Sequence, residues 1–258
     1  MRFPVGVCVF DLDDTLVPNR SREPIDQSLR GVLSDLASSI PLLVATGRPW
    51  VTAAPVIGDM GFAYVAAAGG SQIWSGDGQK VYQRNWSTYA LERFRGVVRK
   101  IANDQVLIND EQLGSHSRLM EEQCVHVAYI MGVPSGLADR FCAEIADTTG
   151  LACRPSSSWV SRGDFDLHVT DNVATKESAL LRMLEWLGAP SSRCLGFGDG
   201  LNDLEMLRLC GYRVAVGSSV PPILLSIADD VCRGPQMGGV EEFISRHLRR
   251  VGGRVWIS

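Results

Sequence analysis

The sequence lacks the features that would place the protein in a membrane or on nucleic acid. Its apolar runs are too short to span a bilayer, and the first of them, residues 3–10, is followed by acidic residues, unlike an export signal. No charge of one sign dominates, because 25 basic residues stand against 29 acidic residues, for a net charge of -4. We therefore expect neither a nucleic-acid partner nor a membrane partner.

Paired cysteines are missing as well. The seven cysteines are scattered, their number is odd, and no two of them have the spacing CxxC. Several lie in apolar runs, where cysteine behaves as a small hydrophobic residue. This usage favours a reducing compartment over a disulfide framework and predicts a cytoplasmic protein. The sequence also contains no internal repeat or low-complexity tract, and it carries no signal for a particular oligomeric state.

The length and composition that remain are those of an ordinary globular protein. A chain of 258 residues allows one large domain, or a core domain with a smaller insert. Hydrophobic residues make up 45% of the chain and charged residues 21%, so the protein can bury an ample core.

The first part of the chain alternates between expected strands and helices. Apolar runs of strand length cover residues 5–10, 41–45 and 63–68. Between the first two runs, apolar residues recur at helical spacing: Ile25, Leu29, Val32, Leu33 and Leu36. This rhythm predicts a parallel sheet flanked by helices.

The pattern changes in the middle of the chain and then returns. Residues 80–166 show hairpin-like strands, a β-rich run at 125–131 and helical patterns at 89–102 and 137–148. Alternation resumes after residues 165–169, with expected helices at 176–187, 204–209 and 240–248 and expected strands at 193–197, 212–216 and 230–232. We predict a core domain formed by residues 1–80 and 167–258, with an inserted α+β domain at 81–166.

A cluster of carboxylates directly follows the first strand. The apolar run ends in Asp11, Asp13, Asp14 and Thr15. A strand that is apolar on both faces is typical of a buried position in a parallel sheet, and the C-terminal ends of such strands lie at the crevice where ligands bind. Like charges packed so closely need a cation or a shared proton to coexist. The cluster therefore predicts a hard metal ion, and Mg2+ fits it best.

Three more motifs occupy comparable places at strand ends or helix starts. They are Thr46-Gly47-Arg48, Lys176, and the segment 198–203, which contains Asp199, Asn202 and Asp203. Strand ends of a parallel sheet share one edge, so these groups can converge and supply the charges, hydroxyl and peptide N–H groups that phosphoryl transfer requires. Taken singly, the aspartate cluster and the segment 198–203 are explained equally well as turns or caps, while Thr46 is better explained as a helix cap or satisfied hydroxyl and Lys176 as a solvated side chain. Their order and placement favour a site.

Together, the four motifs resemble those of the haloacid dehalogenase (HAD) superfamily. The Cof-like phosphatases, which insert an α/β cap of type IIB between the second and third motifs, are the most similar group. The resemblance covers essentially the whole chain. It implies a Rossmann-like parallel-sheet core with an inserted cap, dependence on Mg2+ and an aspartyl-phosphate intermediate.

The resemblance also implies roles for individual residues. Asp11 matches the nucleophile, which also binds the metal through its side chain. Asp13 matches the general acid/base and would bind the metal through its backbone carbonyl. Asp199 matches the direct metal ligand of the fourth motif. Asp14 is a departure, because family members usually have glycine there; aspartate tolerates unusual backbone angles better than most residues.

The remaining matches concern the phosphoryl group. Thr46 and Lys176 match the groups that hold it, and the backbone N–H near Gly47 adds to this cradle. Asn202 and Asp203 would support the metal, its waters or Lys176. Arg48 could contact substrate, orient a motif carboxylate or form an ordinary salt bridge.

A second departure lies after the third expected strand. There the family often has Asn-Gly, whereas this chain has Ala68-Gly69-Gly70-Ser71, which keeps the tight turn but not the polar side chain. In the insert, side chains that could contact the leaving group, each more simply explained as surface or packing residues, are Arg118, Trp159, Arg162 and His168.

Three functions are compatible with this set of residues. The leading hypothesis is a Mg2+-dependent phosphatase that hydrolyses a small phosphorylated metabolite, with sugar phosphates as the favoured class, because a large cap leaves little room for a protein substrate. A phosphomutase of the phosphomannomutase type is the first alternative. A non-catalytic metabolite-binding protein is the second, although the retention of Asp11, Asp13, Lys176 and Asp199 argues against it.

Overall fold

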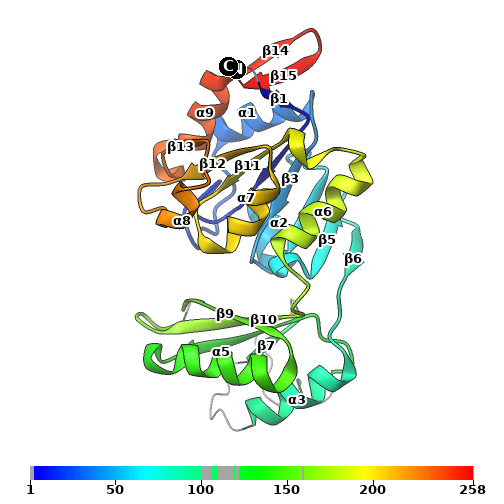
Figure 1. Cartoon of the computed structure of the whole chain (residues 1–258), viewed down its shortest axis with the longest axis vertical. Helices are drawn as coiled ribbons and strands as arrows, with labels where there is room; N and C mark the ends of the chain where they lie inside the picture. Colours follow the sequence, from blue (N-terminus) through cyan, green and yellow to red (C-terminus); the bar gives the residue numbers. More distant parts are fainter. Residues whose placement is uncertain (1–2, 100–105, 110–118, 120–121, 159, 258) are drawn as a thin grey trace. The chain divides into compact units, whose positions relative to one another are not determined.

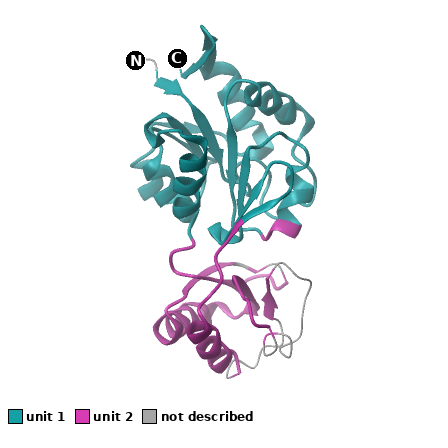
Figure 2. Ribbon diagram, turned by 90° about the vertical axis from the view of Figure 1, so that its right-hand side faces the viewer, with its two compact units in different colours: residues 1–48, 52–81, 175–258 teal, residues 49–51, 82–174 magenta. Residues whose placement is uncertain are grey.

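The computed structural model describes residues 3–99, 106–109, 119, 122–158 and 160–257. The chain divides into two compact units, coloured teal and magenta in Figure 2. The first unit comprises Met1–Arg48, Thr52–Val81 and Thr175–Ser258, and the second comprises Pro49–Val51 and Tyr82–Ala174. Arg118 and Trp159, which we considered as leaving-group contacts, lie outside the described residues.

An eight-stranded sheet forms the centre of the first unit. In spatial order its strands are β13 (Asp230–Cys232), β12 (Tyr212–Val216), β11 (Cys194–Gly198), β2 (Val7–Phe10), β3 (Leu42–Ala45), β4 (Tyr64–Ala67), β5 (Gln72–Ser75) and β6 (Lys80–Gln83). Pairing is parallel from β13 to β4 and antiparallel between β4 and β5. All four residues of β2 are buried, as expected for an interior strand that is apolar on both faces.

Helices cover both faces of this sheet (Figure 1). They are α1 (Gln27–Ala37), α2 (Trp50–Ile57), α6 (Lys176–Leu187), α7 (Leu204–Leu209), α8 (Pro222–Leu225) and α9 (Gly239–His247), with short 3-10 turns η1 (Ala68–Gly70), η2 (Ser191–Arg193), η3 (Leu201–Asp203) and η4 (Pro235–Met237). α1 packs against α9, and α6 packs against α7, β3 and β4. This arrangement confirms the predicted α/β fold class. Within the described part of the chain, no helix has both the length and the apolar character needed to cross a bilayer.

The N-terminal strand differs from the prediction. The apolar run at residues 5–10 divides at Gly6 into β1 (Phe3–Val5) and β2, and the Gly6 N–H donates to the Arg193 carbonyl. β1 instead joins a three-stranded antiparallel sheet with β15 (Arg254–Ile257) and β14 (Leu248–Val251), neither of which the sequence analysis predicted. Gly252 and Gly253, at φ 58° and 73°, form the tight turn of this hairpin.

Among its described residues, the second unit contains a four-stranded antiparallel sheet and two helices. The strands, in spatial order, are β7 (Val106–Ile108), β8 (Val127–Val133), β10 (Phe165–Thr170) and β9 (Ala152–Ser157), and the helices are α3 (Thr88–Val98) and α5 (Ser135–Thr149). A single apolar cluster joins the helices to one face of the sheet, with Phe94, Ile130, Ile145 and Leu167 at 0% exposure.

The return of the chain to the first unit also differs from the predicted boundary. We expected the core to resume at residue 167, which falls inside β10. β10 pairs with β8 and β9 of the second unit, and the chain re-enters the first unit between Ala174 and Thr175. The sequence of an apolar strand near a domain boundary does not show which sheet the strand joins, because strand pairing depends on distant segments.

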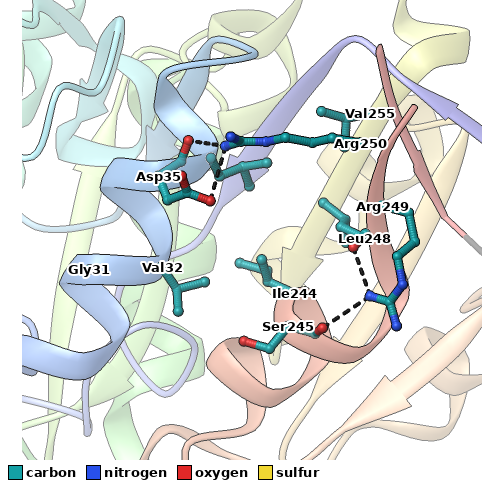
Figure 3. Close-up of a pocket in the computed structure, with 10 residues that line it drawn as sticks. Gly31, Val32, Asp35, Ile244, Ser245, Leu248, Arg249, Arg250 and Val255 are labelled. Atoms are coloured by element: carbon teal, nitrogen blue, oxygen red, sulfur yellow. Dashed lines mark hydrogen bonds and ion pairs between the residues drawn. The ribbon is translucent and has the colours of Figure 1, made fainter. Parts of the chain in front are cut away.

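A cavity of about 490 Å³ lies between α1, α9 and the β14–β15 hairpin (Figure 3). Its lining includes Val32, Ile244 and Val255, but no residue of the predicted site. The two arginines on its rim already have partners. Arg250 binds Asp35, and Arg249 donates to backbone carbonyls of the same wall. This cavity is therefore separate from the candidate active site.

Candidate active site

A buried lysine lies between two carboxylates at the C-terminal edge of the central sheet. The Lys176 Nζ donates to Asp11 Oδ1, and to Asp203 Oδ1 at 2.7 Å. The three side chains are 5%, 4% and 0% exposed, respectively. Because the three residues are far apart in the sequence, this contact is direct evidence that the first, third and fourth motifs converge.

The position of Asp11 follows from the packing of β2. The preceding residue, Phe10, lies opposite Phe197 of β11, and the two rings stack with centroids 4.9 Å apart. The Asp11 N–H then donates to the Phe197 carbonyl at 3.0 Å, so the ladder continues to the point where the carboxylate emerges. A rigid strand end thus holds the candidate nucleophile.

The position of Lys176 follows from the start of α6. The hydroxyl of Thr175 accepts the Ser178 N–H, and the Ser178 hydroxyl reaches back to the Thr175 N–H, which together form a capping box. Gly70 of η1, at φ +101°, packs against Thr175 so closely that a Cβ atom would lie 2.2 Å from the Thr175 carbonyl oxygen. The helix start is therefore fixed from both sides.

The fourth motif forms a loop around Asp203. The second carboxylate oxygen of Asp203 accepts the N–H groups of Asp199 and Gly200 at 3.2 and 3.0 Å. Asp203 therefore fixes the loop with one oxygen and Lys176 with the other. Asp199 is only partly buried and accepts a long 3.5 Å hydrogen bond from the Thr15 hydroxyl, which connects the first and fourth motifs.

Asp13 is held by a two-point contact with Arg48. The Arg48 Nε lies 2.8 Å from Asp13 Oδ2, and the Nη2 lies 2.5 Å from Oδ1. Nη1 donates to the Ser21 carbonyl at 2.7 Å, and the Arg20 N–H donates to Asp13 Oδ1 at 3.0 Å. The Arg48 side chain is 4% exposed, whereas that of Asp13 is 26% exposed. The guanidinium plane therefore sets the direction of a partly accessible carboxylate.

The other predicted residues occupy the edges of this arrangement. Thr46 is 1% exposed, and its hydroxyl accepts the Arg48 N–H at 3.1 Å. Gly47 lies in the same turn and is partly buried. Asn202 lies on the exposed side of η3, next to Asp203. Asp14 has φ 53°, which explains why glycine suits this position, and its carboxylate accepts the Asn19 N–H at 3.0 Å.

The cluster of Lys176, Asp11, Asp199 and Asp203 has an excess of negative charge. Burial raises the pKa of Asp11 well above its usual range, and the nearby Asp203 adds to this, while Lys176 opposes it. Burial works against the charged form of Lys176, but Asp11 and Asp203 outweigh it and raise the pKa of the ammonium. Burial, together with Asp203, raises the pKa of Asp199 to about 6. One ammonium thus faces three carboxylates, an arrangement that favours an added cation.

The donor set suits a hard cation. Ligand oxygens of Asp11, Asp199 and Asp203 all lie within 4.8 Å of one another. Asp203 is already committed to Lys176 and to two backbone N–H groups, so Asp11 and Asp199 are the better-placed side-chain ligands. Carboxylate oxygens are the ligands that Mg2+ prefers, and the residues present fit that ion.

Sequence reasoning missed two supporting residues. Thr175 fixes the first turn of α6, and the pattern of a hydroxyl residue followed three positions later by Ser178 was readable as a helix start. Ser21 contributes a backbone carbonyl to Arg48, for which no side-chain signal exists.

The family comparison agrees with this fold and this arrangement. A family model described as "haloacid dehalogenase-like hydrolase" matches residues 8–130 and 135–244. The protein defined by this fold and these motifs is thus a hydrolase with a Rossmann-like core. The chain belongs to the haloacid dehalogenase-like hydrolases, which confirms the resemblance stated above.

Three proteins that resemble the chain share between 18% and 35% of its residues over the aligned segments. The chain is 35% identical over 103 residues to a phosphoglycolate phosphatase from Methanothermobacter thermautotrophicus, a match covering 40% of this chain and 46% of that protein, or about half its length. It is 24% identical over 244 residues to an HMP-PP phosphatase from Serratia proteamaculans, covering 84% and 85%. A haloacid dehalogenase-like hydrolase from B. subtilis superposes with a TM-score of 0.77 at 18% identity, covering 94% and 99%.

Proposed function

We propose that the chain is a Mg2+-dependent phosphatase that hydrolyses a small phosphorylated metabolite, with sugar phosphates as the favoured class, in the cytoplasm. The observation that carries this proposal is the buried Asp11–Lys176–Asp203 contact at the end of β2. It combines a nucleophilic carboxylate with a fixed cation in a site of excess negative charge. The names of the two curated relatives, both phosphatases of small phosphorylated compounds, support the reaction class.

Asp11 would attack phosphorus. A carboxylate is a weak nucleophile and gains most from orientation, which the Lys176 hydrogen bond and the strand end provide. Its oxygen would form a bond to phosphorus as the bond to the leaving oxygen breaks, which gives an aspartyl phosphate. Lys176, held by Asp203, would stabilise the transferring oxygens without rearrangement.

Mg2+ would be held by the side chains of Asp11 and Asp199 and by the backbone carbonyl of Asp13. When bound, the ion would neutralise the carboxylates and polarise the phosphoryl group. Thr15 would orient Asp199 through its hydroxyl group. Asn202 would support the waters of the ion.

Asp13 would carry the proton. As an acid it would protonate the leaving oxygen, and as a base it would then take a proton from the water that attacks the aspartyl phosphate. Arg48 would serve as a positioning residue for Asp13, because its guanidinium contacts Asp13 from two nitrogens. Thr46 would donate a hydrogen bond from its hydroxyl to a phosphoryl oxygen, with the backbone of Gly47 beside it.

The test is phosphate release from a panel of sugar, polyol and nucleotide phosphates, with Mg2+ and with excess chelator. The proposal expects release that depends on Mg2+ and is largest for sugar phosphates. Isomerised sugar phosphate without free phosphate would instead indicate the phosphomutase. Tight binding of a panel member without turnover would indicate a binding protein.

A further inference from the structure

Two cysteines of the second unit lie in direct contact. Cys142 of α5 and Cys153 of β9 have their Sγ atoms 3.0 Å apart, and both side chains are partly buried. The other sulfur contact, between Cys194 and Cys210 in the first unit, is longer at 3.6 Å and lies at fully buried side chains. The two pairs therefore offer a natural comparison within one chain.

The contact follows from how α5 packs on the sheet. Cys142 lies on the same face of α5 as Ala138 and Ile145, both of which are buried in the apolar cluster. Cys153 pairs in register with Val169, another member of that cluster. Both sulfur atoms therefore point into the layer between helix and sheet. A disulfide requires the sulfur atoms to approach by only about 1 Å more.

The two thiols differ in their roles in this contact. The Cys153 thiol donates a hydrogen bond to the Cys142 sulfur. This bond lowers the pKa of Cys142, against the opposing effects of burial and of Asp139 one turn away. The same bond, together with burial, raises the pKa of Cys153. The hydrogen bond thus favours the thiolate at Cys142 and the thiol at Cys153, which is the order of a reactive and a resolving cysteine.

We propose that Cys142 and Cys153 form a redox modification site, at which a hydroperoxide converts the two thiols into a disulfide that joins α5 to β9. The Cys142 thiolate attacks the terminal peroxide oxygen, so an S–O bond forms, the O–O bond breaks, and the departing oxygen leaves as water or an alcohol after taking a proton. The Cys153 sulfur then attacks the Cys142 sulfur, the S–S bond forms, and hydroxide leaves with the Cys153 proton as water. The two thiols lose two electrons, and the peroxide gains them.

This site is independent of the proposed phosphatase function. Both cysteines belong to the second unit, and the residues of the candidate active site belong to the first. The resting dithiol agrees with a reducing compartment, in which disulfides are transient.

The test uses the full-length protein treated with hydrogen peroxide, followed by blocking of free thiols and peptide mapping by mass spectrometry. We expect a Cys142–Cys153 disulfide that dithiothreitol reverses, while Cys194 and Cys210 stay reduced. With dimedone present, C153S should carry a trapped sulfenic acid at Cys142, whereas C142S should carry none at Cys153. Circular dichroism checks the fold of each variant, and C194S serves as the matched control.

Two results would overturn the inference. One is a folded wild-type protein in which Cys142 and Cys153 stay reduced after exposed Cys124 has been oxidised. The other is a disulfide that joins either cysteine to Cys124 instead. Because both results are read on the wild-type protein, misfolding of a variant does not remove the test.

Discussion

At the scale of single residues, Lys176 is the most consequential side chain. Its ammonium is buried and forms ion pairs with Asp11 and Asp203, whose side chains are 4% and 0% exposed. Removing one partner of a buried ion pair leaves uncompensated charge, which costs far more than the pair itself contributes.

Replacing Lys176 with methionine should therefore abolish activity and lower the free energy of unfolding by roughly 3–5 kcal/mol. The measurement is urea unfolding followed by circular dichroism. The same substitution at exposed Lys80 is the matched control and should change stability little. Equal stability of the two variants would contradict the electrostatic role of Lys176.

A second prediction at this scale concerns Arg48. R48K keeps the charge but loses the two-nitrogen contact with Asp13, so we expect kcat to fall about 10- to 100-fold through misorientation, with KM nearly unchanged. R208K, which alters an exposed Arg208–Glu205 pair, should leave both constants unchanged. A rise in KM with constant kcat would instead show that Arg48 binds substrate.

At the scale of elements, the start of α6 depends on η1. Gly70 and Gly188 both have positive φ, at 101° and 60°, but only Gly70 lies against another segment, the backbone of Thr175. The first glycine abuts the N-terminus of α6, and the second caps its C-terminus. Alanine substitutions at the two positions therefore distinguish the effect of a left-handed backbone from the effect of displacing Lys176.

G70A should cost about 3 kcal/mol of stability and lower kcat, because the Thr175 backbone must move. G188A should cost about 1 kcal/mol, for the left-handed conformation alone, and leave kcat unchanged. Thermal unfolding and phosphate release measure the two effects. Equal kcat values for the two variants would show that η1 does not position Lys176.

Elements also show how far the sequence predicts this structure. α6, α7, β12 and β13 have the predicted bounds. For α6 and β12, apolar residues at helical or strand period end at turn residues. The β1–β15 pairing and the assignment of β10 were not predicted, since both depend on partners distant in the chain. Similarly, the motifs predicted which residues converge, but the Asp13–Arg48 contact was one of several alternatives, because it depends on side-chain direction.

At the scale of the whole molecule, binding of Mg2+ should stabilise the folded chain. A ligand at about 100 times its Kd adds roughly 2.7 kcal/mol to the free energy of unfolding. We expect Mg2+ to raise the Tm of the wild-type protein and D59N, whose residue is exposed, but not of D199N. An undiminished Tm shift in D199N would exclude Asp199 as a ligand.

The central claim is that Asp11 carries the phosphoryl group during turnover. The most direct measurement is acid quenching of D13N, mixed with Mg2+ and an aryl phosphate such as p-nitrophenyl phosphate, followed by mass spectrometry of its peptides. An aryl oxygen leaves without the proton that Asp13 would supply, whereas D13N lacks the base that activates water, so the account predicts an accumulated phosphoryl group on Asp11 and none in the D11N/D13N double variant. A phosphoryl group on another residue, or phosphate release by D11N at the wild-type rate, would contradict it.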